Sequence, residues 1–128
     1  MTEWTPRQLK ILDHVQTLRV ATVSPRGDPF SAPVRFYFDG TALYFTSPAE
    51  SRHMVHLHAN RRLAVLADLA EDGALQGFVV QGLAEWVRSD RMSQDVWEAM
   101  VAKYPDQATG EMPGPMVKVD AVRVHDLD

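Results

Sequence analysis

The chain has 128 residues, of which 45% are hydrophobic and 23% are charged, as in an ordinary globular domain. We expect a single domain over residues 1–128, because two separate cores in this length would be too small to be stable. The formal net charge is −4 and the basic residues are scattered, which argues against nucleic acid as a partner, since that partner needs a basic face.

Sequence features of membrane, secreted and thiol-dependent proteins are also missing. There is no run of about 18 apolar residues, and residues 1–7 lack the basic and apolar pattern of a signal peptide. The absence of cysteine excludes disulfides, thiolate metal ligands and thiol nucleophiles. We therefore expect a cytoplasmic protein that does not associate with membranes.

The first predicted elements are a helix and a strand. Thr5 followed by Pro6 is typical of a helix N-cap with proline in the first turn, and apolar residues then recur at helical spacing over 6–17. A run of β-branched residues predicts a strand over 19–24, which ends at a Pro- and Gly-containing turn at 25–28.

Two further strands complete a predicted antiparallel meander. Residues 30–38 alternate, with Phe36 on the apolar face and Arg35 on the other. Asp39 and Gly40 form a hairpin turn that leads into a strand over 42–46.

The second half of the chain contains two helices and three strands. Ser47 and Glu50 have the spacing of a capping box, which predicts a helix over 48–59. Long strands follow over 63–69 and 76–87, joined by a turn at 70–73. Gly82 marks a bulge or bend in the later strand.

A third helix begins at Ser89 and ends before Pro105. Its apolar stripe, which includes Val96, Trp97 and Met100, indicates a core or a dimer interface, and its large side chains favour the interface. A loop over 109–115 leads to a last strand over 116–124. Six mostly antiparallel strands with helices at the connections indicate a mainly β, closed or half-open barrel.

This order, with its turns, resembles the pyridoxamine 5′-phosphate oxidase-like family of split β-barrels, whose members bind FMN. The resemblance extends from about residue 18 to 124. The stretches that carry it are Tyr44-Phe45-Thr46-Ser47, Glu50-Ser51-Arg52-His53, Asn60-Arg61-Arg62-Leu63 and Gly82-Leu83-Ala84-Glu85.

The resemblance implies a six-stranded antiparallel split barrel that binds FMN, or the deazaflavin coenzyme F420, between the two subunits of a homodimer. It implies that the phosphate is held by Thr46, Ser47, Ser51 and Arg52, next to His53. The ring would lie along the strand that carries Val34, Arg35 and Phe36, and Gln76 would approach it. His53 departs from the family pattern, which usually has lysine there, and a neutral imidazole adds no charge to offset a phosphate.

The residue chemistry at this corner agrees with a phosphate site. A guanidinium and hydroxyls at the start of a helix supply the donors that a phosphomonoester needs. Because Glu50 would use one N–H group as capping partner, we expect side chains to contribute more than the helix dipole. The alternative interpretation is that Ser47 and Glu50 only cap the helix and that Arg52 is a solvated surface residue.

Other kinds of site have weaker support. Glu50, His53 and His56 are three residues apart and could ligate a metal, or one imidazole could ligate haem, but we predict no metal site. No serine has the glycine context of a hydrolase nucleophile, and we assign no catalytic residue. The sequence thus favours an FMN-dependent oxidoreductase acting on an unidentified small molecule. The alternatives are an F420-dependent reductase, a non-enzymatic flavin carrier or sensor, and a haem-binding barrel.

Overall fold

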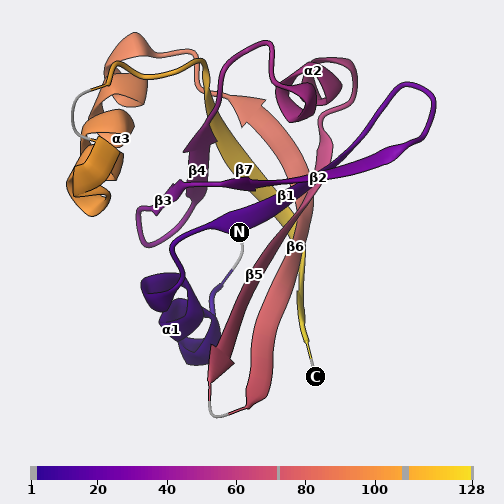
Figure 1. Cartoon of the computed structure of the whole chain (residues 1–128), viewed down its shortest axis with the longest axis vertical. Coiled ribbons are helices and arrows are strands. Elements are labelled where there is room, and N and C mark those ends of the chain that lie inside the picture. Colours follow the sequence, from indigo (N-terminus) through magenta and orange to yellow (C-terminus); the bar gives the residue numbers. More distant parts are fainter. Residues whose placement is uncertain (1–2, 72, 108–109, 128) are drawn as a thin grey trace.

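The computed structural model describes residues 3–71, 73–107 and 110–127, which form a curled antiparallel sheet flanked by helices (Figure 1). The helices are α1 (Pro6–His14), α2 (Arg52–Ala59) and α3 (Asp90–Lys103), and a short 3-10 helix, η1, spans Pro105–Gln107. The strands are β1 (Leu18–Val23), β2 (Pro29–Val34), β3 (Phe36–Phe38), β4 (Leu43–Thr46), β5 (Arg62–Glu71), β6 (Ala74–Trp86) and β7 (Met116–Asp126). None of the helices in the described part of the chain is long and apolar enough to cross a membrane.

The sheet order is β2-β1-β5-β6-β7-β4-β3, and all neighbouring strands are antiparallel. Its two edge strands, β2 and β3, are successive parts of one segment separated by Arg35. Both edges of the sheet therefore converge on this residue, and the sheet curls into a split barrel. The expected fold class is confirmed.

The strand predicted over 30–38 is two strands, so the sheet has seven strands and not six. The reason is a change of partner along the segment. Val34 pairs with Leu18 of β1, whereas Phe36 pairs with Phe45 of β4. Arg35 lies between these pairings and belongs to neither strand.

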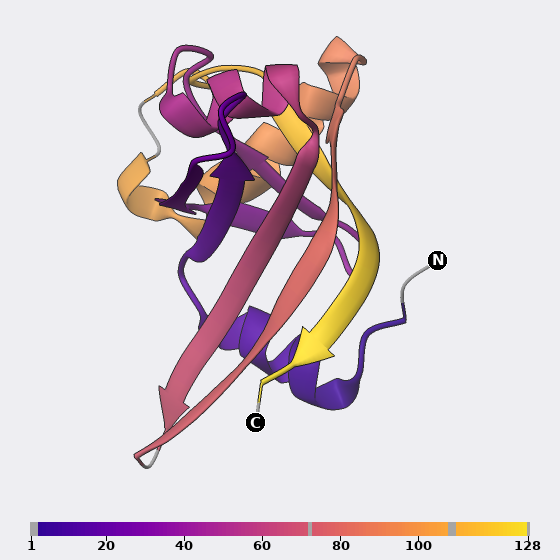
Figure 2. The same cartoon turned by 90° about the vertical axis from the view of Figure 1, so that its right-hand side faces the viewer.

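The main core fills the barrel interior, and α1 closes it from one side. Large buried side chains from the strands include Phe36, Phe45 and Phe78, and Ile11 and Leu12 of α1 pack against the same cluster. Figure 2 shows α1 lying across β5, β6 and β7 at the end of the barrel away from α2.

The first helix ends at His14, and the prediction that it reaches residue 17 is wrong. Thr5 does cap it, and its hydroxyl accepts a hydrogen bond from the Gln8 N–H group. Val15 is already extended, with φ −80° and ψ 145°. This β-branched residue loses rotamer freedom in a helix, and the chain must straighten here to enter β1.

The second helix begins at Arg52, and the predicted capping box of Ser47 and Glu50 is wrong. The Ser47 hydroxyl is instead hydrogen-bonded to His53, at 2.8 Å. The chain turns over 48–51, where both the N–H group and the hydroxyl of Ser51 donate to the Pro48 carbonyl. Ser51 is thus the N-cap, but its side chain makes no capping bond.

The third helix is capped by Ser89 as predicted, but its apolar stripe does not face an interface. Val96, Trp97 and Met100 are buried in a second cluster with Tyr44 and Met116 of the sheet. The preference for an interface is therefore wrong, because the outer side of β4 needs this cover. The predicted loop residue Thr109 and turn residue Asp72 lie outside the described residues.

Candidate functional site

Four predicted phosphate ligands lie at the corner where β4 passes into α2. Thr46 ends β4, Ser47 follows it, Ser51 is the N-cap of α2 and Arg52 is its first residue. These residues are close in space because the turn over 48–51 folds the chain back between them. The corner is therefore formed by one short stretch of sequence.

The hydroxyl groups at this corner already have partners within the chain. Thr46 Oγ1 donates toward the carbonyls of Gly114 and Pro115, at 3.0 and 2.9 Å. Thr46 and Ser47 are 9% and 7% exposed, and Ser47 is bonded to the His53 imidazole. These two hydroxyls stabilise the corner, and only Ser51 and Arg52 reach its surface.

The loop before β7 packs closely against this corner. A Cβ atom on Gly114 would lie 2.1 Å from the Ser47 carbonyl oxygen, well inside van der Waals contact. Only glycine allows the two backbones to approach this closely. The loop thus covers Thr46 and Ser47 on one side and leaves the start of α2 open.

The N-terminus of α2 supplies the N–H donors expected at a helix start, one of which Glu50 was predicted to use. Because no side chain caps α2, the N–H groups of its first turn have no capping partner. Arg52 is exposed beside them, with its guanidinium 5.4 Å from the centre of the Phe30 ring, and it forms no ion pair with any residue that the structure describes. A helix N-terminus next to a guanidinium is an arrangement that binds phosphate. The expectation that Glu50 would use one of these N–H groups is wrong, because no side chain caps α2.

Two of the three imidazoles of α2, those of His53 and His56, are buried and bonded to hydroxyl groups, whereas His58 is exposed and stacks on the Trp86 ring. His56 Nδ1 lies 2.9 Å from the Thr22 hydroxyl, and His53 is bonded to Ser47. Burial, together with the neighbouring His56, lowers the pKa of His53 below 6.5, so it is neutral at physiological pH. Glu50 precedes the helix and does not extend its face, and no cluster of three metal-ligating groups occurs among residues 3–71, 73–107 and 110–127.

The segment predicted to contact the ring has a different environment for each side chain. Val34 and Phe36 point into the core and are 5% and 1% exposed. Arg35 points outward and forms two hydrogen bonds with Asp106, at 2.9 and 3.3 Å, while its guanidinium lies 5.0 Å from the centre of the Tyr104 ring. These bonds lower the pKa of Asp106. The backbone of Phe36 is also occupied, since its N–H group donates to the Tyr104 hydroxyl and its carbonyl accepts from it, at 3.3 and 3.2 Å.

Gln76 lies far from the α2 corner within one chain. It is half-buried on β6, opposite Leu69 and close to the turn between β5 and β6. Figure 1 and Figure 2 show this turn at the opposite end of the barrel from α2. The structure therefore does not bring Gln76 together with Arg52.

An apolar groove lies on the outer face of the sheet beside α2, and sequence reasoning missed it. Its volume is about 430 Å³. It is lined mainly by small and apolar side chains of β1, β5, β6 and β7, among them Ala21, Val23, Ala64, Leu83 and Val122. Thr22, which also lines it, is bonded to His56 of α2, and Arg62 lies at its edge. The sequence contains no signal for this groove, because the 64% exposure of Val122 is known only from the structure.

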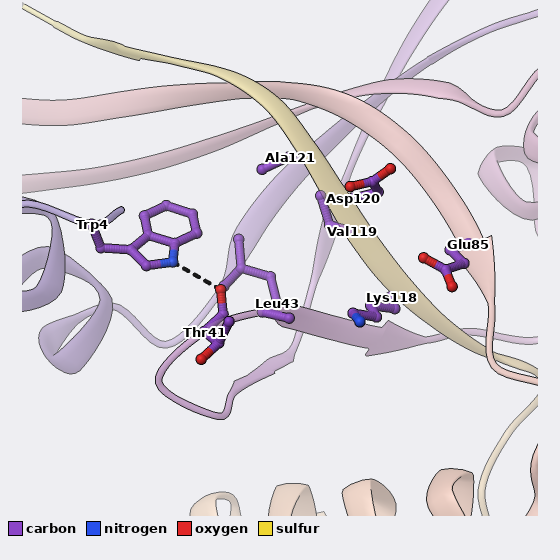
Figure 3. A pocket seen from close by; sticks show the side chains of 9 residues that line it. Trp4, Thr41, Leu43, Glu85, Lys118, Val119, Asp120 and Ala121 are labelled. Atoms are coloured by element: carbon purple, nitrogen blue, oxygen red, sulfur yellow. Dashed lines mark hydrogen bonds between the residues drawn. The ribbon is translucent and has the colours of Figure 1, made fainter. Parts of the chain in front are cut away.

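A smaller pocket lies between the N-terminal segment and β7 (Figure 3). The Trp4 indole closes one end by donating a hydrogen bond to the Thr41 carbonyl, at 2.8 Å. Glu85 and Lys118, which are directly opposite on neighbouring strands, lie toward the other end. The volume of about 190 Å³ is below that of ordinary small-molecule sites, so this pocket does not fit a flavin.

Comparison with known proteins gives the family. The family model of pyridoxamine 5′-phosphate oxidase matches residues 5–127. The chain belongs to this family. No curated protein matches the sequence.

Among solved structures, members of this and related groups share the fold of the chain. A proposed pyridoxamine 5′-phosphate oxidase from Listeria innocua is 21% identical, with 93% of this chain and 94% of that chain covered and a TM-score of 0.76. A FAD-binding protein from Mesorhizobium loti is 21% identical, with 98% of this chain and 95% of that chain covered and a TM-score of 0.76. HutZ, the haem storage protein from Vibrio cholerae, is 16% identical, with 91% of this chain and 89% of that chain covered and a TM-score of 0.78. At these identities the likeness is one of fold.

Proposed function

We propose that this member of the pyridoxamine 5′-phosphate oxidase family is an FMN-binding oxidoreductase that acts as a homodimer. The observation that carries the proposal is the uncapped N-terminus of α2 with the guanidinium of Arg52 beside it, which forms no ion pair within the described part of the chain. A phosphate there would receive hydrogen bonds from both groups, and the partial positive charge of the helix end favours the anion. Ser51, which is half-buried, would complete the shell by rotating its hydroxyl away from Pro48.

The apolar groove next to α2 would accommodate the apolar part of the cofactor or apolar side chains of a second subunit. Bound FMN supplies hydride transfer through its ring, and the protein supplies binding and orientation. The apolar side chains of the groove exclude water, and the exposed Arg62 at its edge adds positive charge. Gln76 would contribute only from the partner subunit, which agrees with a cofactor bound between two chains.

A homodimer would cover the apolar outer face of the sheet. A stable interface buries about 800 Å² on each partner, about a tenth of the 7738 Å² surface of the described chain. The groove residues and Val122 form an apolar patch of the kind that interfaces use at their centre. The cytoplasmic location expected from the sequence stays a prediction.

Haem is the second candidate, because a haem storage protein shares this fold. Haem needs an imidazole or another axial ligand. His53 and His56 are already bonded to hydroxyls, so using either of them would leave a buried hydroxyl without its partner. The third imidazole of α2, His58, is exposed and stacks on the Trp86 ring, with 4.5 Å between the ring centres, so it is the axial ligand that a haem-binding form of this chain would use.

The absorption spectrum of the purified, untreated protein tests the proposal. We expect the two bands of an oxidised flavin, or binding of added FMN when the protein is purified without it. A deazaflavin spectrum would assign coenzyme F420, and a Soret band would assign haem. Oxidation of a reduced pyridine nucleotide in the presence of FMN would distinguish an enzyme from a flavin carrier.

A further inference from the structure

Lys103, the last residue of α3, lies in an unusual environment for a lysine. Its Nζ atom lies 3.4 Å from the centre of the Phe36 ring and 5.1 Å from the centre of the Tyr104 ring. Phe36 is 1% exposed, so the amine rests against the main core. Among the described residues it forms no ion pair and no hydrogen bond.

This lysine lines a groove between α1, β3 and the end of α3, elements that lie near one another in Figure 1. The groove has a volume of about 940 Å³ and is separate from the α2 corner. Part of its wall is apolar and aromatic, with Leu9 and Leu12 from α1 and Tyr37 and Phe38 from β3. The rest is polar or charged and includes Lys10, Asp13 and His14. A ligand with an apolar or aromatic body would fit against these side chains.

The surroundings make Lys103 a better nucleophile than an ordinary lysine. Burial lowers its pKa from 10.5 to about 8, although the nearby Asp13 carboxylate acts in the opposite direction. At about pH 7.5, such a lysine has on the order of 100 times more neutral amine than a lysine of ordinary pKa. Desolvation of this kind activates lysines that form Schiff bases.

His14 places a second useful group in the same groove. Its Nδ1 atom lies 2.8 Å from the Lys10 carbonyl oxygen. Because a carbonyl only accepts hydrogen bonds, Nδ1 carries the proton of the neutral imidazole. Nε2 is therefore the ring nitrogen that can accept a proton.

We propose that this groove is a second ligand site, in which the Lys103 amine forms a reversible imine with an aromatic aldehyde. The nitrogen lone pair attacks the carbonyl carbon and forms a carbinolamine. The carbinolamine then loses water, which carries away the carbonyl oxygen and both amine protons. Nothing is oxidised or reduced, and the imine hydrolyses by the reverse path. The proposal is independent of FMN binding at α2.

Site-resolved labelling of the full chain tests this inference, because the chain has only three lysines, Lys10, Lys103 and Lys118. The protein is incubated with benzaldehyde and cyanoborohydride at about pH 7.5, and the adducts are located by peptide mass spectrometry. We expect Lys103 to be labelled at least about ten times faster than Lys10 and Lys118, since its lower basicity offsets part of the gain in neutral amine. Equal rates at the three lysines would overturn the proposal.

A pair of tryptophan variants separates binding in the groove from simple amine reactivity. Leu9 and Met92 are both exposed helical residues, at 41% and 40%, but only Leu9 lines this groove. Leu9→Trp should slow the labelling of Lys103 at least about threefold by filling the groove, and Met92→Trp should leave it unchanged. An unchanged rate in Leu9→Trp would mean that no ligand site exists here.

Discussion

The Thr46 hydroxyl connects two segments that are far apart in the sequence. It donates toward the carbonyls of Gly114 and Pro115, 68 and 69 residues further along the chain. Its side chain is almost fully buried, so water cannot replace this bond if it is lost. A buried acceptor without a partner lowers stability more than the bond itself adds.

Replacing Thr46 with valine should therefore destabilise the protein. We expect Thr46→Val to lower the free energy of unfolding by about 1–3 kcal/mol, and Thr46→Ser, which keeps the hydroxyl, to recover much of this loss. Urea unfolding of the two variants measures the difference. Thr41→Val is the control, because Thr41 is exposed. Equal stability of the valine and serine variants would show that the hydroxyl has no such role.

His53 should make the stability of the protein depend on pH. Its folded-state pKa is lowered by burial, so the unfolded chain binds the proton first as the pH falls below about 6.5. The free energy of unfolding should be constant with respect to this group above that pH and should fall below it. His53→Gln can keep a bond to Ser47 without titrating, so it should lose less stability. Denaturant unfolding of the wild type and of His53→Gln at about pH 7.5 and 5.5 measures how much stability each protein loses on acidification. An equal loss in the two proteins would contradict the assignment of this pH dependence to His53.

At the residue scale, the sequence predicted side chains that are near one another in the chain and missed distant partners. The grouping of Thr46, Ser47, Ser51 and Arg52 followed from one strand-to-helix junction. Asp106, the partner of Arg35, lies 71 residues away and has no sequence signal. Hydrogen bonds of this kind depend on how the elements pack, which a local pattern does not contain.

Among the elements, the bulge that Gly82 predicted occurs where β6 pairs with β7, and its extra residue is Val122 of β7. The register with β7 shifts between Gln81 and Gly82. A Cβ atom on Gly82 would lie 2.3 Å from the Asp120 carbonyl oxygen, so the two backbones could not keep this distance. The bulge therefore needs glycine for space, although Gly82 has no positive φ.

Gly82→Ala should consequently lower the free energy of unfolding by about 1–3 kcal/mol, as overpacking does in a close-packed site. Gly73 is the control glycine on the same strand pair. It has a φ of 76° but open space around it, and asparagine tolerates this conformation. Thermal unfolding should show Gly73→Asn to be clearly more stable than Gly82→Ala, and the opposite order would contradict the packing argument.

The sequence predicted most element types, because turn and capping residues act locally. The turns at Gly27, Gly40 and Gly73 are confirmed, and each of these residues has a positive φ. The predicted start of α2 was wrong because the Ser47 hydroxyl is bonded to the imidazole of His53, six residues further along the chain, and makes no capping bond. The break at Arg35 was missed because it arises from strand pairing, while the side-chain alternation continues through it.

At the scale of the whole molecule, the order of the strands in the sheet could not be predicted from the sequence and is known only from the structure. Alternation along single strands indicated a barrel, but it does not determine that β5 pairs with β1 or β7 with β4. The long-range pairings leave the outer face of β1, β5, β6 and β7 without a covering helix around the groove. This uncovered face is the basis for the proposed dimer.

Val122→Asp should shift the protein from dimer to monomer. The residue is 64% exposed in the apolar groove, and a charge buried there would have no partner. Sedimentation at micromolar concentration should give a dimer for the wild type and for Met92→Asp, because Met92 lies on α3 away from this face. A monomeric wild type, or a Val122→Asp variant that remains dimeric, would contradict the proposed interface.

The central claim, that α2 and Arg52 bind the phosphate of FMN, is tested most directly by comparing FMN with riboflavin, which lacks the phosphate. Fluorescence titration should show that the wild type binds FMN more tightly than riboflavin. Arg52→Ala should weaken FMN binding by about 1–3 kcal/mol and leave riboflavin binding unchanged. Arg91→Ala is the control, because Arg91 lies on the exposed surface of α3, and it should alter the affinity for neither flavin. Equal affinity of the wild type for the two flavins, or an equal loss for both in Arg52→Ala, would contradict the account.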